Sequence, residues 1–192
     1  ISKWGCRRQA IPQDPGQAGV AQVSYYKRTV FKDLEIVVSS DSSEILKYAG
    51  EHDGVKALRR PDELAADAAD SYCVIKHAYY AMQRQFDFIC LLQPTSPLRV
   101  MHDIARCIGM AETVGGPGVV SCEDGRDVPN GAVYVGRSDW LLDGGNFDSP
   151  GLTRYYMPSA RSIDINTLEE FEQAEDTLHE IFRRMRSRSI HR

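Results

Sequence analysis

Two stretches of the chain are apolar at almost every position, which is the pattern of strands buried on both faces of a sheet. They cover residues 34–39 (LEIVVS) and 86–92 (FDFICLL). Shorter apolar stretches at 55–60, 119–122 and 131–136 also predict strands. Residues 161–166 (RSIDIN) alternate between polar and apolar positions, which predicts a further strand.

Between these stretches, apolar residues return at helical spacing. Helices are predicted within 40–52 and over 71–84, 101–114 and 167–186. Asp41 and Glu44 have the spacing of an N-cap pair for the first helix, and residues 61–67 are expected to form a loop. The residues expected to face the core are Val74, Ile75, Ala78 and Met82 in the second helix and Leu168, Phe171, Ala174, Leu178 and Phe182 in the last.

Strands and helices alternate along the chain. This order predicts an α/β fold with three αβα layers and a mostly parallel sheet. We expect a single domain over residues 1–192, because the sequence has no internal repeat and no low-complexity linker. Ligands of such folds bind at the carboxyl ends of the strands, so the residues that follow each strand are the first candidates for a functional site.

Composition narrows the classes of function. The 192 residues are 42% hydrophobic and 26% charged, as in globular proteins. The net charge of -4, without a basic stripe, argues against a nucleic-acid partner. No apolar stretch approaches the ~20 residues that span a membrane, and the N-terminus lacks a signal-peptide pattern, so we expect a cytoplasmic protein.

The five cysteines are odd in number, and no pair has C-x-x-C spacing. We expect buried free thiols rather than a disulfide or zinc framework, because four of them lie in strand-like or helix-like stretches. The residues are Cys6, Cys73, Cys90, Cys107 and Cys122.

The strand that ends at Leu92 runs into an unusual loop, QPTSPLR. Pro94 and Pro97 fix φ on either side of two hydroxyl residues, so the loop is stiff. It can hold Gln93 and Arg99 over the strand end, where a guanidinium suits phosphate or carboxylate. The alternative is a rigid loop that only starts the next helix.

The strand period of two places Ser162, Asp164 and Asn166 on one face of the predicted strand 161–166. Asp164 would then face a pocket, and a carboxylate there suits Mg²⁺ with phosphate oxygens. The alternative is that Asp164 caps the helix beginning at Thr167, although Thr167 is itself a good N-cap.

The loop at 91–99 (LLQPTSPLR) also resembles a signature of the sugar-acid cytidylyltransferases, the group of the CMP-sialic acid (acylneuraminate) synthetases. Further segments within residues 34–175 resemble that family's motifs in the family order. They are IVVSSDSSEI, RRPDELAADAADSYCVIKHA, VPNGAVYV and MPSARSIDINTLEEFEQAE.

The resemblance implies a fold of the nucleotide-diphospho-sugar transferase type and a homodimer. It also implies an enzyme that transfers CMP from CTP to a sialic-type 2-keto sugar acid and releases pyrophosphate. Mg²⁺ balances the charge of the triphosphate in such enzymes. Activation of a related acid, pseudaminic or legionaminic acid, is an alternative within the same class.

The resemblance further assigns residues. Asp164 matches the catalytic, metal-binding carboxylate, with Asn166 beside it as a second metal ligand. Gln93 and Arg99 match residues that line the sugar-acid side, and Arg99 is the second catalytic candidate.

Three further residues are matched to substrate binding. Ser71 matches a serine near the ribose, although it could instead cap its own helix. Asn130 matches a sugar-binding asparagine, although an ordinary Asn-Gly turn is the alternative. Lys3, with Ser2, matches the phosphate loop.

The opening segment departs from the family, which begins with a strand and a glycine-rich loop, R-x-G-S-K-G. Here the stretch to Thr29 has neither strand nor helix periodicity. Reading codons for residues 11–20 with a shift of one base permits Y-R-K-I-Q-G-K-P-V-L, which resembles family text. Our hypothesis is a frame error over residues 4 to about 29, which the coding DNA would test.

Two other departures bear on activity. The segment between Cys122 and Pro129 is shorter than in the family and has Val128 where a basic residue is usual. Asn166 replaces the second acid of a D-x-D pair. A catalytically impaired or dead member is therefore the main rival, with little or no turnover expected. A dehydrogenase is disfavoured because no G-x-G-x-x-G follows a strand.

Overall fold

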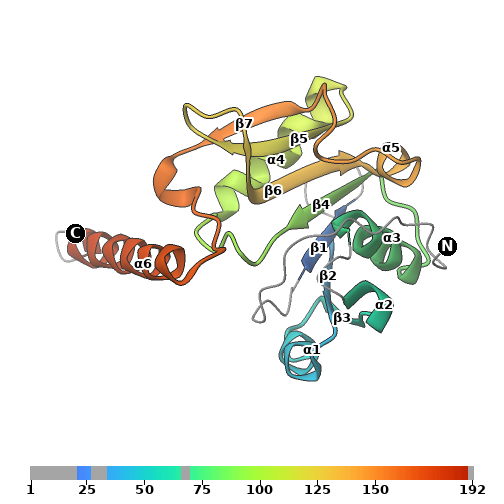
Figure 1. Ribbon diagram of the computed structural model, residues 1–192, viewed down its shortest axis with the longest axis horizontal. Coiled ribbons are helices and arrows are strands. Elements are labelled where there is room, and N and C mark those ends of the chain that lie inside the picture. The colour runs from blue at the N-terminus through green and yellow to red at the C-terminus, as the bar shows by residue number, and fades with distance from the viewer. Residues whose placement is uncertain (1–20, 27–33, 66–69, 190–192) are drawn as a thin grey trace.

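The computed structural model describes residues 21–26, 34–65 and 70–189 (Figure 1). Within these residues, seven strands form one sheet. The strands are β1 (Ala21–Tyr26), β2 (Leu34–Ser40), β3 (Val55–Arg59), β4 (Phe88–Leu92), β5 (Gly118–Glu123), β6 (Pro129–Arg137) and β7 (Thr153–Met157). The helices are α1 (Ser43–Gly50), α2 (Asp62–Ala65), α3 (Ser71–Ala81), α4 (Met101–Val114), α5 (Ser138–Leu142), the 3₁₀ helix η1 (Ser159–Arg161) and α6 (Leu168–Ser189).

The strands lie in the order β3-β2-β1-β4-β6-β5-β7. β1 and β6 are antiparallel to both of their neighbours, whereas β2 pairs with β3 and β5 with β7 in parallel. All strands except β1 and β6 therefore run in one direction within the described sheet. The prediction of an α/β fold with a mostly parallel sheet is confirmed, because β1 and β6 alone are reversed among the described strands.

Alternate residues of β4 face opposite sides of the sheet and divide the core in two. One set packs on α4, and the other packs on α3 and α5, so helices cover both faces as predicted (Figure 1). The first cluster includes Phe88, Cys90, Leu92, Cys107, Ile108 and Ala111. The second includes Ile89, Leu91, Ile75, Ala78 and Leu141.

Most of the predicted elements are present. The strands predicted at 34–39, 55–60, 86–92, 119–122 and 131–136 are β2 to β6, and the four predicted helices are α1, α3, α4 and α6. The predicted N-cap pair of the first helix is wrong, because Ser42 caps α1 by accepting a hydrogen bond from the Ile45 amide at 3.4 Å.

Other predictions fail for local reasons. The expected loop 61–67 contains the short helix α2, and residues 21–26 of the opening stretch form β1. β7 and α5 lacked a recognised pattern. Residues 161–166 do not form a strand: η1 ends at Arg161, and an irregular segment leads to α6.

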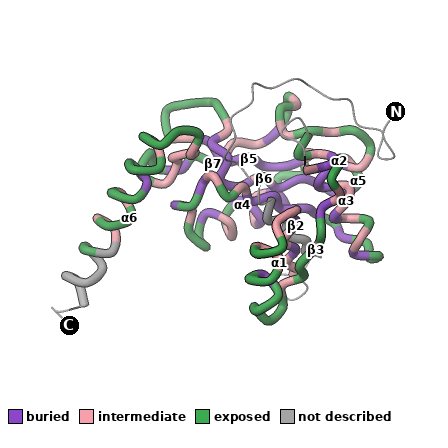
Figure 2. The backbone as a smooth tube through the Cα atoms, turned by 60° about the horizontal axis from the view of Figure 1, so that its bottom comes forward, coloured by how far each residue is buried: buried purple, intermediate pink, exposed green. Residues whose placement is uncertain are grey.

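The inward face predicted for α6 is also wrong for its larger residues. Leu168 is 74% exposed, Phe171 52% and Leu178 40%, whereas Ala174 is buried. The side chain of Phe182 lies outside the described residues. Figures 1 and 2 show the reason: α6 extends away from the sheet instead of lying on it.

The cysteines follow the prediction with one correction. Cys90, Cys107 and Cys122 are buried free thiols. Burial raises the pKa of Cys90 to about 12, so this thiol stays protonated and inert at neutral pH. Cys73 is disulfide-bonded, so the expectation of a free thiol is wrong for this residue. Cys6 lies outside the described residues.

Across the described ranges, no helix is both long enough and apolar enough to cross a bilayer.

Candidate functional site

The strand directions bring three segments of the chain to one edge of the sheet. β4 ends at Leu92, and loop 93–99 follows there. β6 begins at this edge because it runs opposite to β4, and β7 ends at it because it runs in the direction of β4. The start of β6 and the segment 158–166 therefore lie beside loop 93–99.

Three side chains from these segments converge on Gly131, which has a φ of 75°. A methyl group on its Cα would lie 2.6 Å from Ser96 Oγ, 2.9 Å from Gln93 Oε1 and 3.2 Å from Asp164 Oδ1. The Ser96 hydroxyl donates to the Asn130 carbonyl oxygen at 3.0 Å and lies 3.4 Å from Asp164 Oδ1. The structure thus brings together Gln93 and Asp164, two of the residues predicted from sequence.

Loop 93–99 is fixed by hydrogen bonds to its backbone. Arg99 Nη1 donates to the carbonyl oxygens of Gln93 and Ser96, both at 2.6 Å. The Ile165 amide donates to the Thr95 carbonyl oxygen at 2.8 Å, which ties the loop to the segment carrying Asp164. Arg99 lines neither of the two cavities described below, so its catalytic role stays a prediction.

Asn130 is buried, and its side chain is fully occupied by the protein. Its Oδ1 accepts from Ser121 Oγ at 2.6 Å and from the Ala132 amide at 3.2 Å, while Nδ2 donates to Ser162 Oγ at 2.9 Å. These bonds join β5, β6 and the segment after η1. Asn130 therefore does more than form a turn, because its side-chain amide links the two strands to the segment that carries Asp164.

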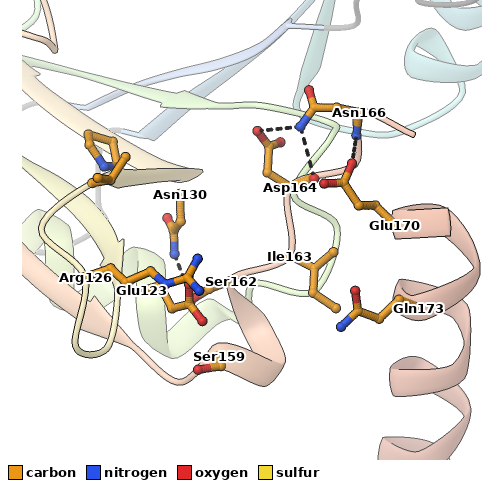
Figure 3. A pocket seen from close by; sticks show the side chains of 12 residues that line it. Glu123, Arg126, Asn130, Ser159, Ser162, Ile163, Asp164, Asn166, Glu170 and Gln173 are labelled. Carbon is orange, nitrogen blue, oxygen red and sulfur yellow. Dashed lines mark hydrogen bonds and ion pairs between the residues drawn. The ribbon is translucent and has the colours of Figure 1, made fainter. Parts of the chain in front are cut away.

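A cavity of about 450 Å³ opens on one side of this point (Figure 3). Arg126 supplies the cation of its lining, and polar side chains of α6 and the segment before it supply much of the rest. The polar lining residues that the argument uses are Arg126, Asn130, Asp164, Asn166, Glu170 and Gln173. Ile163 lines it together with Ser162 and Asp164, so residues 161–166 do not alternate between two faces as predicted.

Asp164 and Asn166 lie together at this cavity, as predicted. Asn166 Nδ2 donates to the main-chain oxygen of Asp164 at 3.2 Å and to its Oδ2 at 3.4 Å. The alternative role of Asp164 as a helix cap is not needed, because Thr167 and Glu170 form a capping box for α6. The Glu170 amide donates to Thr167 Oγ1 at 3.2 Å, and Glu170 Oε2 accepts from the Thr167 amide at 2.9 Å.

Few side chains that could bind a metal ion lie near Asp164. Within the described residues, no group of three or more His, Cys, Asp or Glu is arranged to hold an ion. One carboxylate and one amide oxygen fit Mg²⁺ when phosphate oxygens and water supply the remaining ligands, which is the usual arrangement for this ion. Asp164 and Asn166 are therefore compatible with Mg²⁺ that arrives with a phosphorylated substrate.

A smaller cavity of about 180 Å³ is lined by Gln93 and by one more of the predicted residues, Ser71. Ser71 and Gln93 line it together with Tyr72, Tyr134 and Phe147. Burial raises the pKa of Tyr134 to about 12, so its phenol remains a hydrogen-bond donor at neutral pH. Ser71 is not the cap of α3; Asp70 is, through a bond from the Tyr72 amide at 3.0 Å.

A buried carboxylate supports the segment that carries Asp164. Asp103, with no exposed surface, accepts two hydrogen bonds from Arg161, one from Nε at 3.0 Å and one from Nη2 at 2.8 Å. It also accepts from Tyr155 Oη at 3.1 Å and from the Val100 amide at 2.9 Å. Burial opposes its ionisation, but these hydrogen bonds outweigh burial and hold the pKa of Asp103 below its ordinary value.

Sequence reasoning missed several residues of the site. Ser121 and Tyr134 lie inside stretches that were interpreted only as strands, and Glu170 and Gln173 were given no role in the last predicted helix. A polar residue inside an apolar strand, such as Ser121, was the available signal. Lys3 lies outside the described residues, so its assignment to the phosphate loop stays a prediction.

Comparison with known proteins supports the family suggested by the motifs. The chain is 26% identical over 175 residues to an N-acylneuraminate cytidylyltransferase of Streptococcus agalactiae serotype III, covering 74% of this chain and 42% of that protein. It is 36% identical over 80 residues to the enzyme of that name from Escherichia coli O18:K1:H7, covering 42% of this chain and 19% of that protein.

A third relative carries a different sugar in its name. The CMP-N,N'-diacetyllegionaminic acid synthase of Legionella pneumophila is 34% identical over 84 residues, covering 42% of this chain and 36% of that protein. No protein-family model matches the sequence.

The chain spans less than half the length of these relatives. The match to the S. agalactiae protein runs over 175 residues but uses 74% of the 192-residue chain, so that relative has residues without a counterpart here.

Proposed function

The chain is related in sequence to the acylneuraminate cytidylyltransferases, and we propose that it is a nucleotidyltransferase domain that moves CMP from CTP to a sialic-type 2-keto sugar acid. In this reaction the anomeric hydroxyl oxygen of the sugar acid attacks the α-phosphorus of CTP. The bond from that phosphorus to the β-phosphate oxygen breaks, pyrophosphate leaves, and the hydroxyl proton is lost. Both substrates are anions, and the sugar acid carries a carboxylate.

One observation carries the proposal: Gln93, Ser96 and Asp164 converge on Gly131 between two cavities. A transfer between two substrates needs both held with their reacting atoms adjacent. The smaller cavity offers hydroxyl and amide groups from Ser71, Gln93 and Tyr134, which suit sugar and ribose hydroxyls. The larger cavity offers the carboxylate of Asp164, which suits a cation bound to phosphate.

The protein's own groups act mainly by positioning. Arg99 and the Ile165 amide hold the backbone of loop 93–99. Because the loop is already ordered, it loses little conformational entropy when a substrate binds to Gln93. Asp164 and Asn166 would hold Mg²⁺, which when bound neutralises charge on the triphosphate. Arg126 is placed to attract an anion into the larger cavity.

The test is pyrophosphate release by the purified chain with CTP, Mg²⁺ and N-acetylneuraminic acid. We expect only a low rate of release, which requires both substrates and is lost without Mg²⁺. Parallel reactions with pseudaminic and legionaminic acid decide which acid is used. A substrate-independent rate, or a rate that persists with GTP in place of CTP, would contradict the proposal.

A second candidate is a catalytically impaired member of the same family that still binds CTP. Two sequence features favour it: Asn166 in place of a second acid and the atypical opening segment. Titration calorimetry with CTP separates the candidates. Binding of CTP without pyrophosphate release would identify the impaired form, whereas absence of both would exclude the family function for this chain.

A further inference from the structure

The guanidinium that lines the larger cavity is already paired with a carboxylate of the protein. Arg126 and Glu123 both line this cavity, and Figure 3 shows their side chains together at its wall. Arg126 Nη1 lies 3.2 Å from Glu123 Oε2, which is the distance of an ion pair. The remaining charged residues of the described lining, Asp164 and Glu170, are acidic. An anion that enters the cavity therefore meets a cation that a carboxylate already holds.

The turn between β5 and β6 fixes the backbone of this pair. Glu123 is the last residue of β5, and the Arg126 amide donates to its carbonyl oxygen at 3.0 Å. Gly125 has a φ of 78°, the left-handed conformation that glycine adopts readily in turns. The Asp124 amide donates to the Met157 carbonyl oxygen at 2.8 Å and so attaches the turn to β7. Because their backbones are held together, the two side chains need only change rotamer to pair or to separate.

The two partners of this ion pair differ in exposure. The side chain of Arg126 is 74% exposed, whereas that of Glu123 is 25% exposed. An ion pair with so exposed a partner adds little to stability, since water solvates the guanidinium and pairing restricts a flexible side chain. Arg126 can therefore leave Glu123 at little cost. A carboxylate or phosphate of a ligand can then accept two hydrogen bonds from the planar guanidinium.

A second carboxylate beside Arg126 is engaged elsewhere. Asp127 Oδ1 accepts hydrogen bonds from Arg154 Nε at 3.1 Å and from Tyr156 Oη at 3.3 Å, both of which belong to β7. Asp127 is thereby held toward β7, whereas Glu123 is held against Arg126. Glu123 is therefore the carboxylate with which a ligand has to compete.

We propose that Glu123 is a specificity-determining residue that occupies Arg126 while the cavity is empty and releases it to an anionic group of the substrate. This inference rests on the proposed function and deepens it, because it names what sets the affinity for the anion. The exchanging group is a carboxylate or a phosphate. A neutral ligand cannot replace the charge that Arg126 loses on leaving Glu123, so the pair favours ligands whose anionic group reaches the turn.

The exchange is tested by titration calorimetry with N-acetylneuraminic acid and, separately, with CTP and Mg²⁺. Glu123→Gln keeps the shape of the side chain and removes the competing charge. The dissociation constant of one of these ligands should fall roughly threefold to fivefold, the scale of an exposed ion pair. A gain with the sugar acid identifies a carboxylate as the exchanging group, and a gain with CTP identifies a phosphate. Unchanged affinity for both ligands would overturn the proposal.

Asp124→Asn is the matched control, because it removes one negative charge from the same turn at a residue that does not line the larger cavity. It should leave both dissociation constants nearly unchanged. A gain equal to that of Glu123→Gln would show that any carboxylate of the turn repels the anion, and it would overturn a specific exchange with Arg126.

A double-mutant cycle tests whether Glu123 acts through Arg126. Arg126→Gln should weaken binding of the anion more in the Glu123→Gln protein than in the unmodified chain, because the guanidinium there has no competitor. Equal losses in the two backgrounds would indicate independent charges and overturn the proposal. These titrations need no turnover, so they are separate from the test of the reaction. Pyrophosphate release together with equal losses would uphold the reaction and refute the exchange.

Discussion

Gly131 is the most constrained residue of the candidate site. It lies at the start of β6, where the loop after β4 and the segment before α6 both approach its Cα. The absence of a side chain is what allows Gln93, Ser96 and Asp164 to meet. The positive φ adds a second reason for glycine, since other residues are strained there.

Gly131→Ala should therefore damage both stability and activity. We expect a loss of about 1–3 kcal/mol in the free energy of unfolding from the backbone conformation and the close contacts. CTP-dependent pyrophosphate release should fall further, because the new methyl group pushes the three side chains apart. Gly54→Ala is the control: it has a φ of 79° and no atom within 4 Å of the added methyl, so it carries the backbone cost alone. Equal effects of both changes would argue against crowding at Gly131.

Asn166 is the residue at which the chain departs from the D-x-D pattern, and it contacts Asp164 directly. Asn166→Asp should add a second carboxylate to the cation site. We expect the Mg²⁺ concentration needed for half-maximal activity to fall roughly tenfold, or about 1.4 kcal/mol of binding free energy. The melting temperature should also become more sensitive to Mg²⁺, which can be measured without turnover.

Asn146→Asp serves as the control for this change, because Asn146 lines the smaller cavity instead. It should leave the Mg²⁺ dependence unaltered. If Asn166→Asp changes neither the activity at limiting Mg²⁺ nor the melting temperature, residue 166 has no part in holding a metal.

The sequence could identify a site residue where the chemistry of its side chain suggested a single role. Gln93 follows a buried strand, and it lies at the carboxyl edge of β4 as predicted. Asp164 lies near it, although the strand that was predicted to carry Asp164 does not form. Ser121 could not be predicted in the same way, because its partner, Asn130, is close only after β5 and β6 pair. Arg99 had an apparent use in binding anions, yet its Nη1 bonds to its own loop.

At the scale of elements, Asp103 joins the start of α4 to η1 and β7. A single carboxylate accepts hydrogen bonds from the amide of Val100, the N-cap residue of its own helix, from the guanidinium of Arg161 and from the hydroxyl of Tyr155. Arg161 precedes Asp164 by three residues. The position of the catalytic candidate therefore depends on a helix that contributes nothing to the cavity lining described here.

The hydrogen bonds accepted by the Asp103 carboxylate make the stability of the protein dependent on pH. Because the pKa of Asp103 is lower in the folded than in the unfolded protein, its stabilising contribution is present above the unfolded value of about 3.9 and is lost as pH falls through the lower folded value. Asp103→Asn should cost about 3 kcal/mol at pH 7, the loss typical of removing one partner from a buried ion pair. Urea unfolding of both proteins between pH 7 and pH 3 measures the difference.

The gap between the two proteins should shrink below about pH 4, because Asp103 of the unmodified chain then takes up a proton in the unfolded state before it does so in the folded state. A gap that stays constant down to the most acidic pH would show that Asp103 contributes through shape alone.

Two errors in predicting elements have a common physical origin. The alternating residues 161–166 fit a strand, but none of the strands that the structure describes pairs with them, and the Ile165 amide instead bonds to loop 93–99. The amphipathic pattern of α6 was interpreted as a face toward the chain's own core. Periodicity reports that a face is apolar, but it does not identify what covers that face.

At the scale of the whole molecule, the layers were predictable and the strand directions were not. Apolar strands separated by helices indicated sheet and cover, and β4 packs on both sides as expected. The hydrophobic pattern of a strand does not depend on the direction in which the strand runs. The sequence therefore did not reveal that β1 and β6 are reversed. That reversal matters for the site, because it brings the start of β6 to the end of β4.

Glu170 has two tasks, because it completes the capping box of α6 and also lines the larger cavity. The first turn of the helix is therefore part of the wall that an occupant of the cavity would meet. Fraying of that turn would widen the opening. By the reciprocity of linkage, an occupant resting against Glu170 would keep the first turn wound.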